Sequence, residues 1–519
     1  MTDRLAAGKV PWDAIAEVLE QDLPPEVQLG PAAGEDAALV EIGGETWAVA
    51  TDPITFTAED AGRLAVTVNA NDIAVRGARP RFFTLAVLLS PTDESADRAR
   101  EIITQARDAC REIGAVLVGG HTEVTPGLAH SLVVGTMLGR VEGRPITTGE
   151  LRAGDRIGMT RWAGIEGTAI LLAEHGRRLR ALHGDDAFAE LEEVLSGGWL
   201  SVVPEALAAA SAAATTSLHD VTEGGVGEAL YELGVASGLR IEVDRGTVPV
   251  RRETAKMCAD MGLDPLGLIG SGALLVGCAE GREAEVEAAV TLTGVPLTWI
   301  GRAVAGRPPG SSLPRFPRDE LLRVEALDQI RFVLFDMDGT LVDSEYDWPA
   351  IRRRLGVEGG SIIDELNDLP EPERSEKWTR MCEIEREATE RAELADGVPE
   401  LLSLLRSKRM RTALVTNNTD ANAIHLVERF GLELDLVLTR DCGMWKPSGA
   451  PLAEAMRRLG ADPERTLAVG DSSYDLQAAR EAGCARVCIL NPDRERYRDD
   501  ADLWFAGARG LMRYLEIVL

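Results

Sequence analysis

The chain has 519 residues, of which 45% are hydrophobic and 27% charged, and its formal net charge is -30. This length suggests about three domains, and the composition is that of folded protein. The strong negative charge argues against nucleic-acid and anionic-membrane partners, because both need basic patches. No stretch reaches the roughly 18 apolar residues of a membrane span. Phosphate ligands remain allowed, since a bound divalent cation reverses the local sign of the charge.

Seven cysteines are scattered along the chain without a CxxC pair, and the N-terminal residues contain no apolar run resembling a signal peptide. A sparse, odd set of cysteines is typical of reduced thiols, so we expect a cytoplasmic protein. Lysine is rare and stands only at positions 9, 256, 377, 408 and 446. A lysine inside a motif is therefore more informative here than an arginine.

The first part of the chain mixes strands and helices in two sections. Residues 34–145 contain five β-like runs: AALVEI, TWAVAT, FFTLAVLLS, AVLVGG and SLVVGTMLG. Helical stretches are predicted near 60–77 and 95–113. Residues 150–305 combine the strands RIGMTR and ALLVGCA with Ala-rich helices near 165–180, 202–214 and 279–290. The pattern predicts a two-lobed α+β unit, with lobes at 1–148 and 149–305.

Polar clusters stand at or near the ends of several of these apolar runs: Gly34-Glu35-Asp36, Thr51-Asp52-Pro53, Asn69-Ala70-Asn71-Asp72, Gly119-Gly120-His121-Thr122-Glu123 and His219-Asp220. Carboxylates that converge on one cleft can hold Mg²⁺ against a triphosphate. Glycine pairs allow the backbone to approach phosphates closely. The clusters therefore indicate a site for ATP and Mg²⁺.

The stretches TDPITFTAEDAGRLAVTVNANDIAVRGARPRF, VGGHTEV, LHDVTEGGVGEAL and LIGSGALLVG resemble the PurM-like family. This family contains aminoimidazole-ribonucleotide (AIR) synthetase, thiamine-monophosphate kinase, selenophosphate synthetase and the HypE-related hydrogenase-maturation dehydratase. The resemblance covers residues 30–305 and implies binding of ATP with Mg²⁺ and a homodimer built through the N-terminal lobe. It implies six ATP or metal ligands: Asp36, Asp52, Asn69, Asp72, Glu123 and Asp220.

The acceptor substrate of this half stays open. The hydrogenase-maturation members end in a catalytic cysteine tail, whereas no cysteine lies here between Cys278 and Cys382, which disfavours dehydratase chemistry. Asp36 and Asp72 are also compatible with caps or turns, and His121 with a core or hinge residue. A nucleotide-binding or dimerisation module without turnover therefore remains an alternative to an ATP-consuming enzyme.

Residues 306–329 are predicted to be a linker, because GRPPGSSLPRFPRDE contains four prolines and two glycines and should sustain neither helix nor strand. After it, the runs FVLFD, TALVTN, LVLTR, LAVGD and RVCIL alternate with helices. This alternation predicts a Rossmann-like parallel sheet, with its site at the carboxyl ends of the strands.

Four polar motifs end or follow these strands: Asp336-Met337-Asp338-Gly339-Thr340, Thr416-Asn417-Asn418, Trp445-Lys446-Pro447 and Gly470-Asp471-Ser472-Ser473-Tyr474-Asp475. Two carboxylates at one strand end can divide the work of a covalent nucleophile and a proton carrier. A hydroxyl, backbone donors and a lysine suit phosphate oxygens, and further carboxylates suit Mg²⁺.

In this order the four motifs resemble the haloacid dehalogenase superfamily of phosphatases over residues 330–519. The resemblance implies that Asp336 is the nucleophile and Asp338 the general acid and base. It implies phosphate binding by Thr416, Asn417 and Lys446. It also implies a magnesium site made by Asp336, Asp338 (through its backbone carbonyl), Asp471 and Asp475.

The resemblance further implies a small helical cap at about 344–396, which suits a compact phosphorylated metabolite. The Arg and Glu runs of this segment are interpreted as solvated helix faces, and no specificity residue is assigned. The sequence thus predicts a bifunctional enzyme, in which a phosphatase is fused to a unit that uses ATP to activate or phosphorylate a small molecule. A phosphomutase is the alternative for the rear domain.

Overall fold

A computed structural model of the chain describes residues 8–10, 12–19, 21–54, 60–92, 95–195, 198–324, 329–357, 360–493, 496–497 and 500–519. Residues 325–328 of the predicted linker and the first seven residues of the predicted N-terminal lobe lie outside this set. Two compact units are present, Met1–Cys258 with Leu263–Leu322 and Arg323–Leu519 with Ala259–Gly262. Among the helices of the described residues, none combines the length and apolar character of a membrane span. All seven cysteines are free thiols.

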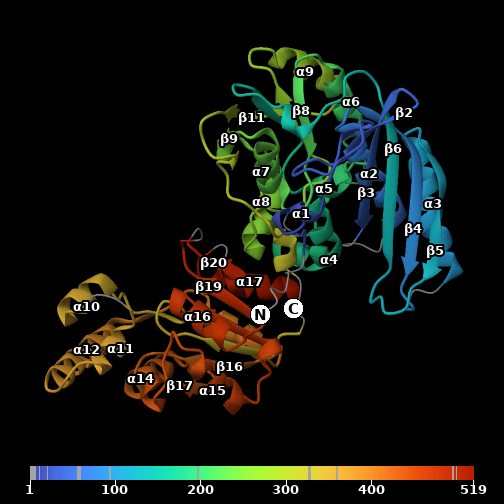
Figure 1. Cartoon of the computed structure of the whole chain (residues 1–519). Coiled ribbons are helices and arrows are strands. Elements are labelled where there is room, and N and C mark those ends of the chain that lie inside the picture. Colours follow the sequence, from blue (N-terminus) through green and yellow to red (C-terminus); the bar gives the residue numbers. More distant parts are fainter. Residues whose placement is uncertain are drawn as a thin grey trace. The chain divides into compact units, whose positions relative to one another are not determined.

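The first unit begins with a six-stranded sheet that is antiparallel except for its β4–β5 pair. In spatial order its strands are β1 (Val27–Leu29), β2 (Ala38–Ile42), β3 (Glu45–Ile54), β6 (Leu132–Val141), β4 (Ala78–Leu89) and β5 (Val116–Val124). Helix α1 (Ala16–Leu19) precedes the sheet, and α2 (Ala61–Ala74) and α3 (Ala96–Glu112) pack together, with α2 against β3 and β6 (Figure 1). Alternating residues of β4 are buried, as expected of a strand with one face on the core.

The second sheet of this unit has the order β12 (Gly310–Ser311), β9 (Arg240–Val243), β11 (Leu297–Val304), β7 (Arg156–Thr160), β10 (Leu274–Cys278) and β8 (Thr215–Asp220). Its helices are α4 (Ile165–His183), α5 (Ala189–Leu195), α6 (Val203–Ser211), α7 (Gly225–Ser237), α8 (Arg252–Met261) and α9 (Glu283–Thr291). One hydrophobic cluster joins Ile73 and Met137 of the first lobe to Leu218 and Val276 of the second. The two predicted lobes therefore share a core, and the α+β fold class is confirmed.

Part of the predicted linker belongs to this unit. Gly310–Ser311 forms β12 and pairs with β9, and Glu320–Arg323 forms a 3-10 helix. Phe316 is buried against α7, where a Cβ at Gly227 would lie 2.4 Å from its ring. The prediction that residues 306–329 sustain neither helix nor strand is wrong for these residues, because prolines shorten the elements without preventing burial.

The second unit is built on a parallel sheet, as the sequence predicts. Its strand order is β17 (Leu436–Leu438), β16 (Arg411–Val415), β13 (Phe332–Phe335), β18 (Thr466–Gly470), β19 (Arg486–Leu490) and β20 (Leu503–Phe505). The helices of this domain are α13 (Val398–Ser407), α14 (Asp420–Phe430), α15 (Ala450–Leu459), α16 (Ser473–Glu481) and α17 (Ala508–Val518). Because β16, β13 and β18 are neighbours, the residues that follow their carboxyl ends meet at one edge.

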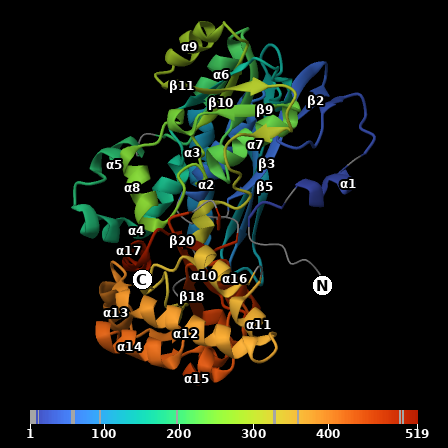
Figure 2. The ribbon, with the colours of Figure 1, turned by 90° about the vertical axis from the view of Figure 1, so that its left-hand side faces the viewer.

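A helical segment is inserted between β13 and β16. The short antiparallel strands β14 (Val342–Asp343) and β15 (Glu393–Leu394) pair where the segment leaves and rejoins the domain. Between them lie α10 (Trp348–Leu355), α11 (Ile362–Asn367) and α12 (Glu373–Arg391), and Figure 2 shows α12 beside α11. These helices bury a small core of their own, which includes Leu355, Leu366 and Met381. We refer to residues 344–392 as the cap.

Candidate functional site

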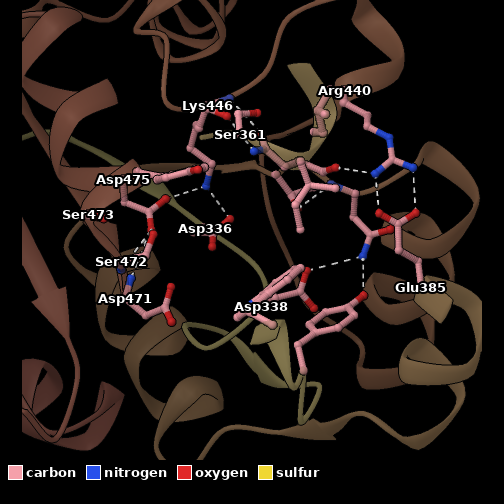
Figure 3. A pocket seen from close by; sticks show the side chains of 18 of the residues that line it. Asp336, Asp338, Ser361, Glu385, Arg440, Lys446, Asp471, Ser472, Ser473 and Asp475 are labelled. Atoms are coloured by element: carbon pink, nitrogen blue, oxygen red, sulfur yellow. Dashed lines mark hydrogen bonds and ion pairs between the residues drawn. The ribbon is translucent and has the colours of Figure 1, made fainter. Parts of the chain in front are cut away.

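The polar motifs of the second unit meet at the carboxyl edge of its sheet, around a cavity of about 330 Å³ (Figure 3). Asp336 follows β13, and its backbone N–H donates to Val469 O of β18 at 2.8 Å. Thr416 follows β16, and Asp471 and Asp475 follow β18. The structure therefore brings together every residue predicted for this site, from segments far apart in the chain.

Lys446 is the central cation of the cavity. Its Nζ lies 2.5 Å from Asp336 Oδ1 and 2.6 Å from Asp475 Oδ1, and its side chain is only 5% exposed. Burial opposes the charge, but the carboxylates of Asp336 and Asp475 outweigh it and raise the pKa of Lys446. The lysine is therefore charged at neutral pH, and an ammonium group is a suitable partner for an anionic ligand.

Asn417 holds this lysine in place. Its Nδ2 donates to Lys446 O at 2.8 Å, and its Oδ1 accepts from Lys446 N at 2.7 Å. Both groups of the side-chain amide are thus used on the backbone of the lysine loop. The geometry makes Asn417 a positioning residue, and a contact of its side chain with phosphate, as the family resemblance implied, would have to replace these bonds.

Three carboxylates form a candidate cation site. Each of Asp336, Asp471 and Asp475 offers a carboxylate oxygen, and these oxygens lie within 4.8 Å of one another. Burial and the charge of Asp475 raise the pKa of Asp471 to about 7, and burial raises that of Asp336 well above its ordinary value. Buried carboxylates that lie this close repel one another when they are ionised, and a divalent cation between them removes this repulsion. A set of oxygen ligands suits Mg²⁺.

Asp338 occupies a separate place in the cavity. Its Oδ1 accepts from Ser344 Oγ at 2.5 Å, and its Oδ2 accepts from Asn418 Nδ2 at 3.4 Å. Burial raises the pKa of this carboxyl group, which favours its protonated form. Thr416 lines the same cavity, and its Oγ1 accepts from Asn418 N at 3.1 Å. No role was assigned to Ser344 or Asn418 from the sequence, although Asn418 is the last residue of the predicted Thr416-Asn417-Asn418 motif.

An ion pair between the cap and the domain also lines the cavity. Arg440 Nη2 lies 2.6 Å from Glu385 Oε2, and Nη1 bonds to the other carboxylate oxygen. Glu385 of α12 is 3% exposed. The interpretation of the cap's acidic residues as solvated is therefore wrong for Glu385. The missed signal is helical spacing, since Glu385 falls between the apolar residues Met381 and Ala388 on the buried face.

Four aspartates gather in the first unit. Burial, together with the charges of Asp52 and Asp220, raises the pKa of Asp72 well above its ordinary value. Burial and the charge of Asp36 raise the pKa of Asp220 to about 7. Asp220 Oδ1 is buried and has no hydrogen-bond partner among the described residues. An orphaned oxygen among mutually repelling carboxylates can accept a cation, although among the described residues no three of these aspartates bring ligand oxygens within 4.8 Å of one another.

Two basic residues that the sequence reading did not select flank these aspartates. Asp36 Oδ2 lies 2.8 Å from Arg76 Nη2 and 2.9 Å from His219 Nδ1. Burial opposes protonation of His219, but Asp36 and Glu232 raise its pKa to about 10. Asp36 is thus part of an ion-pair network and not a cap. His219 was visible in the His219-Asp220 cluster, whereas nothing in the local sequence distinguishes Arg76 from other arginines.

Two of the predicted ligands in this unit are placed differently. Asn69 Oδ1 accepts from Asp52 N at 3.0 Å, and Nδ2 donates to Ala65 O at 2.8 Å, so its amide positions the backbone of β3. Glu123 lies on β5, which β6 and β4 separate from Asp52 on β3. Its exposed carboxylate bonds to His121 and Thr125. Within one chain the structure does not bring Glu123 to the four aspartates, and His121 is exposed and is not a core residue.

Comparison with known proteins identifies both units. Residues 34–141 and 152–311 match the N-terminal and C-terminal domains of AIR synthase related protein, and residues 330–483 match haloacid dehalogenase-like hydrolase. Carbamoyl dehydratase HypE of Rhodobacter capsulatus is 32% identical over 308 residues, covering 57% of this chain and 87% of its own length. Phosphoglycolate phosphatase of Chromobacterium violaceum is 30% identical over 191 residues, covering 31% of this chain and 86% of its own length. The chain belongs to both families.

Among solved structures, hydrogenase maturation protein HypE in complex with ATP is 26% identical, with a TM-score of 0.43. It covers 52% of this chain and 79% of its own.

One glycine of the haloacid dehalogenase-like unit fixes the distance between two of its acidic motifs. Gly339 has φ +78°, and a Cβ there would lie 2.3 Å from Asp471 Oδ2. We expect Gly339→Ala to displace the Asp471 carboxylate and to raise the Mg²⁺ concentration needed for half-saturation of the candidate cation site by about tenfold or more. Calorimetric titration with Mg²⁺ measures this. Gly460→Ala is the control, because Gly460 has φ +64° with no atom near its missing Cβ. An equal magnesium requirement in both variants would contradict the prediction.

Proposed function

We propose that the haloacid dehalogenase-like unit is a magnesium-dependent phosphohydrolase of a small phosphorylated metabolite, working through an aspartyl-phosphate at Asp336. The observation that carries the proposal is the ammonium of Lys446 between Asp336 and Asp475, beside a carboxylate cluster that fits Mg²⁺. The similarity to a phosphoglycolate phosphatase supports the same reaction class. A small cap over the cavity suits a small substrate, because such a cap excludes water and leaves limited room.

The proposed reaction has two steps. A carboxylate oxygen of Asp336 attacks phosphorus, and as this O–P bond forms, the bond to the leaving oxygen breaks and Asp338 donates its proton to that oxygen. Water then attacks the phosphorus of the aspartyl-phosphate, Asp338 takes the proton of the water, and phosphate leaves with the Asp336 carboxylate restored.

Each group has a stated place in these steps. Asp336, Asp471, Asp475 and the backbone carbonyl of Asp338 are the proposed ligands of Mg²⁺, which when bound neutralises charge on the phosphoryl oxygens. In this proposal Lys446 supplies a second positive charge, and Thr416 donates to a phosphate oxygen. A phosphate-release screen of the full chain with Mg²⁺, with and without ATP, tests the proposal. Formation of an isomeric phosphate without release of free phosphate would indicate a mutase instead.

We propose that the AIR synthase related unit binds ATP with Mg²⁺ at Asp36, Asp52, Asp72 and Asp220 and uses it to activate or phosphorylate a small molecule. The crowded carboxylates and the orphaned oxygen of Asp220 support this site. The proposed reaction differs from that of the carbamoyl dehydratase of Rhodobacter capsulatus, because the relatives of that kind end in a catalytic cysteine tail. Residues 306–322, which follow the second lobe here, contain no cysteine.

We expect Asp220→Asn to weaken binding of ATP with Mg²⁺ by about tenfold or more, because one carboxylate of the cation site loses its charge. Calorimetric titration of the full chain measures the dissociation constant, in a background of Asp336→Asn so that the phosphatase does not consume ligand. Asp185→Asn is the matched control, since Asp185 is exposed in the second lobe. Equal affinity of the two variants would reject the assignment of Asp220. Binding without ATP consumption across a metabolite panel would favour a non-catalytic module.

We propose that the AIR synthase related unit forms a homodimer through strand β5. This edge strand exposes Val116, Val118 and Val124, and Phe82 of the neighbouring β4 is exposed as well. Exposed apolar edge strands tend to pair with another chain. Sedimentation of the full chain should give twice the monomer mass of 55.8 kDa, and the Val118→Glu variant should sediment with the mass of a single monomer. Leu292→Glu, at an exposed position of the second lobe, should leave the dimer intact. A monomeric parent chain would refute the proposal.

A further inference from the structure

The side chains that the cap contributes to the phosphohydrolase cavity are mainly aromatic and aliphatic. Tyr346 and Trp348 stack with ring centroids 4.6 Å apart, and Ile362 and Ile363 line the same cavity. Asn418 Nδ2 lies 3.5 Å from the hydroxyl oxygen of Tyr346 and also contacts Asp338. The aromatic side chains of the cap therefore begin beside Asp338, the proposed general acid. A leaving group that departs from phosphorus and takes its proton from Asp338 therefore meets aromatic and aliphatic side chains.

The two buried charged residues of this region, Arg440 and Glu385, are already paired with each other. Arg440 uses both terminal nitrogens on the Glu385 carboxylate, and Nη1 also donates to Asn417 O at 2.8 Å. Arg352 donates to Gly360 O at 2.6 Å and lies 3.7 Å from Glu365 Oε1, and the exposed Arg496 also lines the cavity. Figure 3 shows Arg440 and Glu385 joined by two dashed lines. A substrate that enters this region meets a neutralised guanidinium and the carboxylate that neutralises it.

Building on the proposed function, we infer that the substrate has an uncharged leaving group with an apolar or ring-shaped part. Glu385 excludes leaving groups that carry a second acidic function. A carboxylate beside this pair would face the carboxylate of Glu385, while both terminal nitrogens of Arg440 already bind Glu385. The ring pair and the isoleucines stabilise an apolar group by burial. Phosphoglycolate, whose leaving group carries a carboxylate, is by this inference a poor substrate here, in contrast to the related phosphatase.

Two phosphate monoesters that differ in one group test the inference. Phenyl phosphate has an uncharged ring, and 4-carboxyphenyl phosphate adds a carboxylate to it. Their dissociation constants are measured by calorimetry with Mg²⁺ in the full chain carrying Asp336→Asn, so that selectivity is read without turnover. We expect phenyl phosphate to bind at least about tenfold more tightly. Adding Glu385→Gln frees the guanidinium of Arg440, and the preference should fall by about tenfold or reverse.

Two further variants keep the result decisive. Glu383→Gln, at an exposed position of the same helix, should keep the preference of the parent. The double variant Glu385→Gln with Arg440→Gln removes both charges and should restore the preference for phenyl phosphate. Equal or tighter binding of 4-carboxyphenyl phosphate by the parent overturns the inference, and so does a folded Glu385→Gln variant with an unchanged ratio. Hydrolysis of acetyl phosphate by the chain with Asp336 intact tests the proposed function separately.

Discussion

Replacing Asp336 by Asn in the full chain is expected to lower phosphatase turnover by at least about a thousandfold. The amide has nearly the shape of the carboxylate but cannot form the covalent bond to phosphorus. Because Asp336 lies against Lys446 and near two other carboxylates, the loss of its charge removes repulsion as well as attraction. The fold should therefore survive, and steady-state phosphate release from a small monoester gives the effect directly.

A matched control separates the chemistry from the general effect of losing an acidic group. Asp368 is exposed at the end of α11 in the cap, so Asp368→Asn should keep the activity of the parent chain. Rapid-quench experiments should show labelled phosphate on the parent protein and none on Asp336→Asn. If Asp336→Asn retained turnover within about tenfold of the parent, the nucleophile would have to be another residue.

The sequence predicted those features that depend on local order. Strand runs such as FVLFD and LAVGD became β13 and β18, and because parallel neighbours end at one edge, Asp336 and Asp471 could be expected to meet. The presence of a helical cap followed from the family resemblance and from the polar, helix-like character of the segment. These predictions needed only periodicity and the order of the motifs.

Contacts between distant segments were not predictable in this way. The family resemblance implied ligand roles for Asn417 and Asn69, but their amides bond to backbone groups, because each lies beside a chain segment that local sequence does not reveal. Glu385 of α12 forms an ion pair with Arg440, which lies in a different element. Glu123 lies on the edge strand β5, away from the aspartates with which it was expected to bind a cation. In each case the residue type was informative, and the partner depended on tertiary packing.

Replacing Lys446 by Met is expected to have two opposite effects. Turnover should fall by roughly a hundredfold to a thousandfold, because a buried cation that meets the phosphoryl group is lost. The affinity for Mg²⁺ should rise, since Asp336 and Asp475 no longer share their charge with the ammonium group. Steady-state kinetics and magnesium titration of the same preparation measure both quantities.

This combination distinguishes a lost catalytic charge from a damaged fold, because unfolding would weaken magnesium binding along with activity. Lys408→Met is the control, as Lys408 is exposed at the end of α13 and should change neither quantity. If Lys446→Met bound Mg²⁺ more weakly than the parent while remaining folded, the lysine would be supporting the cation site. Its role would then be to order the carboxylates, and the charge on the transferring phosphoryl group would need another partner.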